Sequence, residues 1–284
     1  MKLWLILFII VLGLLLISAA ILRHQTNAIE ESVQWNPAKA DGQRIPVIVE
    51  LFTSEGCSSC PSADEVLARL ERIQPVAGAE IIALGEHVDY WNYIGWTDPF
   101  SSPVFSNRQN SYARAFNNTD VYTPQMVVDG QVQFVGSKMN KALEAIANAA
   151  RAPKAKVQIT PTPGINSDTY SFQVRATDLP AISAGETAEV VLAITESNLQ
   201  SKVSRGDNAG RRLSHGTVVR QLDIISSTQA RQGKPLTAAS SMTVRNDWQR
   251  DKLLAVAFVQ QRKSRKVIGA AAARLVNFQT PNTK

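Results

Sequence analysis

The sequence predicts an α/β domain followed by an all-β, sandwich-like domain, behind an N-terminal transmembrane or signal helix. Three observations lead to this fold class. They are an uncharged apolar run over residues 3–22, a segment order typical of β-α-β-α-β-β-α over 45–150, and short strands with turn signals after Ala152-Pro153. The expected limits are 1–22 for the signal anchor or signal peptide, 23–44 for a linker, 45–153 and 154–278 for the two domains, and 279–284 for a tail.

The N-terminal run is long enough to cross a membrane. It holds 20 residues without a charge, LWLILFIIVLGLLLISAAIL, and a helix of that length measures about 30 Å. This length favours an uncleaved anchor, while a signal peptide cleaved near Ser18, Ala19 and Ala20 is the alternative. Lys2 precedes the run, so in both cases we expect the remaining chain outside the cytoplasm, on the periplasmic side.

The first domain is predicted from helix and strand periodicities that alternate along the chain. The apolar residues Ala63, Val66, Leu67 and Leu70 recur at helical spacing, and Asp129-Gly130 marks a two-residue hairpin turn. In chain order we expect a strand at 45–53, a helix at 58–73, a strand at 80–90, a helix at 101–117, a hairpin at 124–136 and a helix at 137–150.

The second domain is predicted from alternating residues such as Tyr170, Phe172 and Val174, which suit strands with one buried face. A polar stretch over 197–216 is expected to be a loop, which folds back on the first domain, meets a partner or is simply solvated. Seven strands are expected, at 155–161, 169–177, 188–195, 217–226, 238–245, 252–260 and 266–276.

Composition excludes several classes of protein. The chain is 44% hydrophobic with a net charge of only +6, which excludes disorder for most of its length. Its basic residues are scattered apart from a short run at 262–266, so we expect no nucleic-acid partner. Two cysteines are too few for a disulfide-stapled scaffold, and no two of the three histidines are close enough for a helical zinc motif.

Those two cysteines, Cys57 and Cys60, form a CSSC motif between a predicted strand and a predicted helix. A helix N-terminus stabilises a thiolate, so the thiol pKa should fall there. We expect Cys57, the outer residue, to attack a substrate and Cys60, one turn inside the helix, to resolve the mixed disulfide.

Thr123-Pro124 directly precedes the strand expected at Gln125. Together with CSSC it resembles the thioredoxin fold, and this resemblance implies a cis Thr123–Pro124 bond that faces the cysteines and offers backbone to a substrate peptide. Gly56 departs from the tryptophan that many thioredoxins carry before the first cysteine.

Longer motifs extend the resemblance to nearly the whole chain beyond the linker. They resemble the secreted, thioredoxin-like family called domain of unknown function 1223, which implies a fold and a CxxC motif but no proven reaction. The motifs are VELFTSEGCSSCPSADEVL (49–67), HVDYWNYIGWTDPFSSP (87–103), RQNSYA (108–113), VYTPQMVVDG (121–130) and RGDNAGRRLSHGTVVR (205–220).

Four further residues are candidates with two interpretations each. Trp91, in an aromatic cluster after the second strand, either binds substrate or roofs the core. His87 and Asp89 share a strand face and either relay a proton to the cysteines or are structural. Glu50, inside an apolar strand, either acts as a buried acid–base near the resolving thiol or pairs with a basic residue.

The function that these residues favour is thiol–disulfide exchange with protein thiols or disulfides, without a cofactor, in a protein attached to the membrane through its N-terminal helix. Two alternatives stay open. One is a Cu(I) carrier that uses both thiolates with His87, since soft thiolates suit Cu(I). The other is a non-catalytic binding protein with a structural disulfide, so whether the chain is an enzyme is left open. A dedicated metal site is not expected, because four zinc ligands are lacking.

Overall fold

The computed structural model describes residues 44–166, 168–229 and 232–275. The predicted N-terminal helix, nearly all of the linker and the C-terminal tail lie outside these residues. Within them, no helix combines the length and the hydrophobicity that a membrane crossing requires. The predicted domain limits stay predictions.

The first half of the described chain forms one four-stranded sheet with three α-helices. The sheet has the order β2-β1-β3-β4, with β1 parallel to β2 and antiparallel to β3. A turn at Asp129 and Gly130, both with positive φ, joins β3 to β4. The elements are β1 (Ile45–Thr53), α2 (Pro61–Ile73), β2 (Ala79–His87), α3 (Pro103–Ala115), β3 (Gln125–Val128), β4 (Val132–Val135) and α4 (Met139–Ala149).

The second half forms two antiparallel sheets, with the orders β11-β10-β7-β8 and β5-β6-β9. The strands β7 and β8 are long and pair with each other almost throughout. The elements are β5 (Lys156–Pro163), β6 (Thr169–Thr177), β7 (Ala188–Lys202), β8 (Arg212–Thr228), β9 (Leu236–Thr243), β10 (Leu253–Gln261) and β11 (Val267–Arg274).

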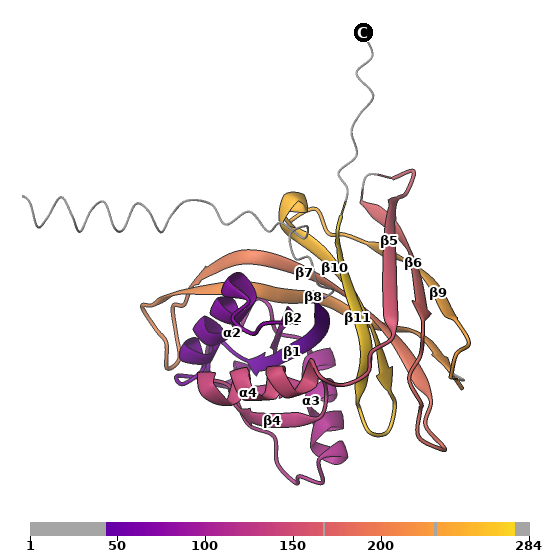
Figure 1. The fold of residues 1–284 in the computed structure, drawn as a ribbon. Coiled ribbons are helices and arrows are strands. Elements are labelled where there is room, and N and C mark those ends of the chain that lie inside the picture. Colours follow the sequence, from indigo (N-terminus) through magenta and orange to yellow (C-terminus); the bar gives the residue numbers. More distant parts are fainter. Residues whose placement is uncertain (1–43, 167, 230–231, 276–284) are drawn as a thin grey trace, which may run out of the picture. The chain divides into compact units, whose positions relative to one another are not determined.

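The helices and the three sheets are stacked in layers, and an apolar cluster fills the space between each layer and the next. Helices α2 and α4 cover one face of the first sheet, where Val49, Leu51 and Leu70 are buried. Its other face packs on the second sheet through a shared apolar cluster that includes Ile48 and Phe258. The second sheet then packs on the three-stranded sheet. Figure 1 shows β7 and β8 passing over the first sheet.

The predicted fold class is therefore wrong. The described chain is mostly β, with 44% in strands and 19% in helices, rather than an α/β thioredoxin-like domain followed by a separate sandwich. The segment 197–216 accounts for part of the error, because Ser197–Lys202 and Arg212–Gly216 extend β7 and β8 instead of forming a loop. Their pairing supplies the backbone hydrogen bonds that their polar sequence does not signal.

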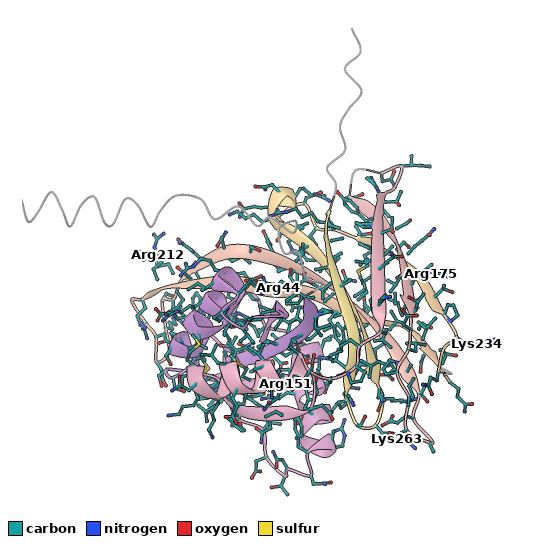
Figure 2. The ribbon with its side chains drawn as sticks, viewed as in Figure 1. Arg44, Arg151, Arg175, Arg212, Lys234 and Lys263 are labelled. Carbon is teal, nitrogen blue, oxygen red and sulfur yellow. A yellow bond between two sulfur atoms is a disulfide. The ribbon has the colours of Figure 1, made fainter. Side chains whose placement is uncertain are left out.

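Basic side chains lie on many different elements of the described chain. Figure 2 labels six of them, and these come from both halves of the sequence. They are Arg44, Arg151, Arg175, Arg212, Lys234 and Lys263.

Candidate functional site

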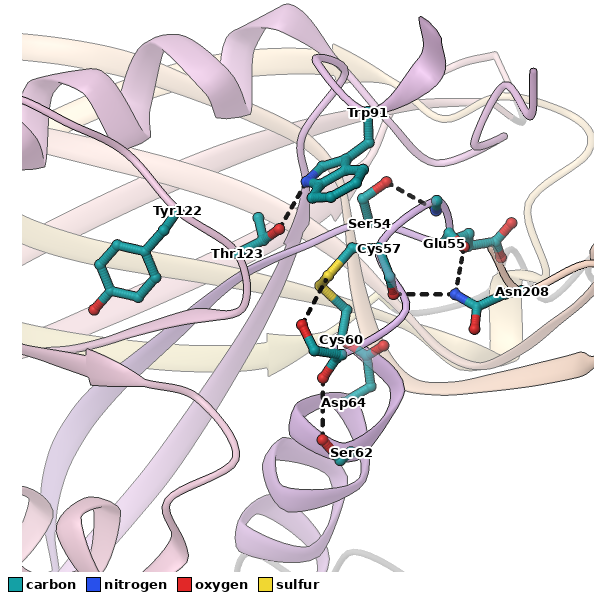
Figure 3. Close-up of a disulfide and its surroundings, with 12 residues drawn as sticks. Ser54, Glu55, Cys57, Cys60, Ser62, Asp64, Trp91, Tyr122, Thr123 and Asn208 are labelled. Atoms are coloured by element: carbon teal, nitrogen blue, oxygen red, sulfur yellow. Dashed lines mark hydrogen bonds between the residues drawn. A yellow bond between two sulfur atoms is a disulfide. The ribbon is translucent and has the colours of Figure 1, made fainter. Parts of the chain in front are cut away.

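Cys57 and Cys60 form a disulfide at the junction of β1 and α2 (Figure 3). Their Cα atoms are 5.4 Å apart. Cys60 is the N-cap residue of α2 with no side-chain cap, and Pro61 occupies the first turn, where its missing N–H costs nothing. Both sulfurs are buried, whereas Ser58 and Ser59 between them are exposed. Cys57 Sγ lies 3.5 Å from the exposed Ser59 Oγ, so this sulfur is adjacent to the surface residues of the turn.

A second segment, at the start of β3, lies near the disulfide. The Thr123–Pro124 bond is cis, as the resemblance implies. Trp91 Nε1 donates a 2.7 Å hydrogen bond to Thr123 Oγ1 (Figure 3). A Cβ on Gly136 would stand only 3.0 Å from Ala63 in the first turn of α2 and 3.5 Å from Pro124, so these two residues lie close together. The structure thus brings all three predicted substrate-binding residues, Trp91, Thr123 and Pro124, to the same region as the cysteines.

The loop between β2 and α3, residues 88–102, is here called the aromatic loop, and it contacts the CSSC turn directly. A side chain at Gly56 would stand 3.2 Å from both Ile94 Cδ1 and Trp91 Cβ. This close approach explains the glycine that departs from the thioredoxin pattern, because Trp91 and Ile94 occupy the space of a side chain there. Tyr93, between these two residues in the chain, is 83% exposed, so this loop also presents a large aromatic side chain at the surface.

The loop that remains between β7 and β8 is shorter than the predicted 197–216, and it folds back on the disulfide, which is one of the outcomes expected for that stretch. Asn208 is buried, and its Nδ2 donates hydrogen bonds of 2.8 Å to the Glu55 carbonyl and 3.0 Å to the Cys57 carbonyl (Figure 3). Gly206 has a positive φ of 73°, and a Cβ there would stand 3.1 Å from Ile94. The loop therefore holds the backbone of the turn that carries Cys57.

Behind the disulfide lies a buried group of titratable side chains, here called the histidine–carboxylate cluster. Its members come from the CSSC turn, α2, β2, the aromatic loop and β8, and no side chain among them is more than 9% exposed. They are Glu55, Asp64, His87, Asp98 and His215.

Two histidine–carboxylate pairs organise this cluster. His87 Nδ1 is 2.7 Å from Asp98 Oδ2, and His215 Nε2 is 3.0 Å from Glu55 Oε1. The two imidazole rings meet edge to face, with their centroids 4.7 Å apart. Asp64 Oδ2 lies 3.8 Å from His215 Nδ1, a buried nitrogen without a hydrogen-bond partner among the described residues.

The surroundings shift the pKa values of three members. Burial raises the pKa of Asp64, although the charges of His215 and His87 partly oppose the rise. Burial by itself would lower the pKa of His87, but the charge and hydrogen bond of Asp98 outweigh it and the pKa is raised. Burial opposes ionisation of Asp98 too, yet the interaction with His87 and backbone hydrogen bonds lower its pKa.

The predicted acid–base residues have different partners from those expected. Asp89 does not pair with His87, because its carboxylate accepts a 2.5 Å hydrogen bond from Ser106 Oγ while His87 bonds Asp98. Glu50 is fully buried and forms an ion pair with Arg108, with Oε1 at 2.5 Å from Nε. Of its two interpretations, the structure shows the pairing with a basic residue.

Four members of the cluster and Asn208 are absent from the candidates drawn from the sequence. Glu55 and Asp64 flank the CSSC motif by two and four residues, a signal that the motif itself offered. Asp98 and His215 lie in the longer family motifs, but nothing local shows that β8 brings His215 to the cysteines.

The described residues contain no group of three or more His, Cys, Asp or Glu side chains arranged to hold a metal ion. His87, the third ligand of the Cu(I) alternative, is hydrogen-bonded to Asp98 instead.

Comparison with known proteins shows the family to which this sequence belongs. The family described as "Protein of unknown function (DUF1223)" matches residues 48–260, which is most of the chain. The chain belongs to this family. A search of the curated proteins finds no match.

Two solved structures are similar to this DUF1223 chain over most of its length. Protein AGR_C_4864 from Agrobacterium tumefaciens is 24% identical, with a TM-score of 0.62, covering 85% of this chain and 98% of that one. HBP35 of Porphyromonas gingivalis is 15% identical, also with a TM-score of 0.62, covering 84% of this chain and 77% of that one. At these identities the likeness shows the fold alone.

Proposed function

We propose that this DUF1223 chain is an extracytoplasmic thiol–disulfide exchange protein that acts on protein thiols or disulfides through Cys57 and Cys60. The observation that carries the proposal is a disulfide across an exposed two-residue turn at the N-terminus of a 13-residue helix. The free N–H groups and the dipole at such an end favour thiolate over thiol. They therefore favour the nucleophile of exchange and also the leaving group.

The exchange step follows from the positions of the two sulfurs. An external protein thiolate attacks Cys57 Sγ, next to the exposed Ser59. The new bond joins the external sulfur to Cys57, the Cys57–Cys60 bond breaks, and its electron pair leaves on Cys60 Sγ. The cysteine pair is reduced and the external thiol is oxidised into a mixed disulfide. In the opposite direction Cys57 thiolate attacks a substrate disulfide and Cys60 releases the product.

A purely structural role explains the disulfide less well. A bridge between residues three apart closes a very short loop, which removes little conformational entropy from the unfolded chain. The turn is already held by backbone hydrogen bonds and by Asn208. We also propose a relationship to the thioredoxin-like superfamily. The CSSC motif supports this relationship, and the overall fold does not.

The substrate surface proposed here combines Trp91, the exposed Tyr93 and the segment at Thr123-Pro124. Aromatic side chains in the loop that contacts the CSSC turn suit an extended or unfolded peptide better than a small thiol. The extracytoplasmic location rests on the N-terminal apolar run and agrees with a compartment in which disulfides persist.

The test uses the full chain and two matched variants. Cys60→Ser keeps the attacking thiol but lacks the resolving one, so it should accumulate mixed disulfides with an unfolded protein disulfide. Cys57→Ser should accumulate far fewer, because Cys57 Sγ adjoins the exposed Ser59 whereas Cys60 is the N-cap residue of α2. Equal trapping by both variants, or by neither, contradicts the assigned roles.

The reduction potential of the wild-type pair decides between exchange and structure. We expect a value between about −270 and −120 mV, the range of exchange proteins. A value below about −300 mV would show a structural disulfide and favour a binding function.

A further inference from the structure

We propose that Asp64 supplies the proton to the Cys60 sulfur when the disulfide opens and takes it back when the disulfide closes, with His215 as the residue that positions and tunes it. This inference rests on the proposed exchange function and adds the acid–base group that the chemistry needs. Neither residue belongs to the CSSC motif.

The helix places Asp64 one turn from Cys60. Cys60 has helical backbone angles at the N-cap, and the Asp64 N–H donates a 3.0 Å hydrogen bond to the Cys60 carbonyl. Residues four apart on a helix lie on one face, with their Cβ atoms about 5–6 Å apart. Figure 3 shows Asp64 beside Cys60 at the start of α2.

Among the three carboxylates of the histidine–carboxylate cluster, Asp64 is the one best placed to gain and lose a proton. Glu55 and Asp98 each have an imidazole partner at 3.0 Å or less, whereas Asp64 is 3.8 Å from the nearer nitrogen of His215. Even with both histidines charged, three carboxylates would leave one negative charge unbalanced in a buried site. Protonation of Asp64 removes that charge.

Other observations agree with this assignment. Burial raises the pKa of Asp64, so its acid form extends to higher pH than that of an exposed aspartate. His215 and His87 oppose the rise through their charges and Thr53 opposes it through its hydroxyl group. The charge of Asp98 adds to the rise. The His215 Nδ1 that faces Asp64 at 3.8 Å is buried and has no hydrogen-bond partner among the described residues.

The proton transfer completes the exchange step. When an external thiolate attacks Cys57 Sγ, the electron pair of the broken bond resides on Cys60 Sγ. The Asp64 carboxyl proton moves to that sulfur, which gives a Cys60 thiol and an Asp64 carboxylate. In the reverse step the carboxylate removes the thiol proton, so that Cys60 attacks the mixed disulfide as a thiolate and restores the Cys57–Cys60 bond.

The test measures how fast dithiothreitol reduces the full chain between about pH 5 and pH 9, expressed per dithiothreitol thiolate. The wild-type rate should fall at least tenfold as Asp64 loses its proton, because the acid is then absent. Asp64→Asn should be slower at low pH and nearly independent of pH. His215→Asn should move the wild-type midpoint to higher pH, because the imidazolium that stabilises the carboxylate is gone.

Glu71→Gln is the matched control, since Glu71 lies two turns further along α2 and bonds Thr217 of β8. It should follow the wild-type profile. A wild-type profile in Asp64→Asn would overturn this inference and leave the exchange function standing. Wild-type protein that dithiothreitol does not reduce at any pH would overturn both proposals. Where Asp64→Asn does not fold, an unshifted midpoint in His215→Asn overturns the inference.

Discussion

The two faces of the first sheet carry two buried charged clusters of opposite design. Neighbouring residues of β2 supply both, because side chains alternate along a strand: Glu86 points to one face and His87 to the other. On the face toward the second sheet lies what we call the arginine cluster. Its members are Glu50, Glu86, Arg108, Tyr112, Gln260 and Arg265.

The arginine cluster is built around a permanent charge. Arg108 bonds Glu50 at 2.5 Å and the Tyr112 hydroxyl at 3.1 Å. Burial raises the Glu50 pKa but the Arg108 charge outweighs it, so the pKa is lowered. Burial and the nearby Glu50 charge hold the pKa of Glu86 well above its usual value. Guanidinium does not release its proton, whereas imidazole is the side chain whose ordinary pKa lies closest to neutral pH. The arginine cluster therefore suits the attachment of the two sheets to each other, and the histidine–carboxylate cluster suits proton transfer beside a sulfur.

The largest effect is expected from Arg108→Met. It would leave the Glu50 carboxylate buried without its cation, which costs about 3–5 kcal/mol of unfolding free energy at pH 7. Lys156→Met removes the exposed ion pair with Asp178 and should cost less than about 1 kcal/mol. Urea unfolding of the full chain measures both. A loss for Arg108→Met as small as that of the control would show that the arginine cluster is no anchor.

The sequence predicts the features that depend on neighbouring residues, but not the contacts between residues far apart in the chain. The disulfide, the helix after it and the hairpin at Asp129-Gly130 follow from neighbours in the chain, and the structure contains all three. The fold class was wrong because β7 and β8 extend through polar residues that only their mutual pairing stabilises. The same extension brings His215 to Asp64, a tertiary contact that no local sequence pattern predicts.

The next effect is expected from Glu86→Gln and concerns pH. Because the folded-state pKa of Glu86 lies well above the unfolded value of about 4.3, wild-type stability is full below that value. It is lost as pH rises through the folded pKa. The variant has no such loss, so its stability relative to the wild type should rise by up to about 1.4 kcal/mol for each pH unit between pH 5 and pH 8. Unfolding curves at several pH values test this, with exposed Glu65→Gln expected to follow the wild type. If the stability of Glu86→Gln and that of the wild type changed with pH in the same way, Glu86 would not be protonated in the folded protein over this range.

The smallest effect is expected from His87→Asn on the opposite face. Asp98 raises the His87 pKa despite burial, so the pair contributes stability fully below about pH 6.5 and loses it as pH rises through the folded pKa. The variant should be less stable than the wild type by about 1–2 kcal/mol at pH 6, and the difference should narrow above that. Because the sheet separates the two clusters, the pH profile of a His87→Asn, Glu86→Gln double variant should equal the sum of the single profiles within about 0.5 kcal/mol. A larger departure would mean that the two clusters titrate as one, and that proton movement behind the disulfide is coupled to the anchor between the sheets.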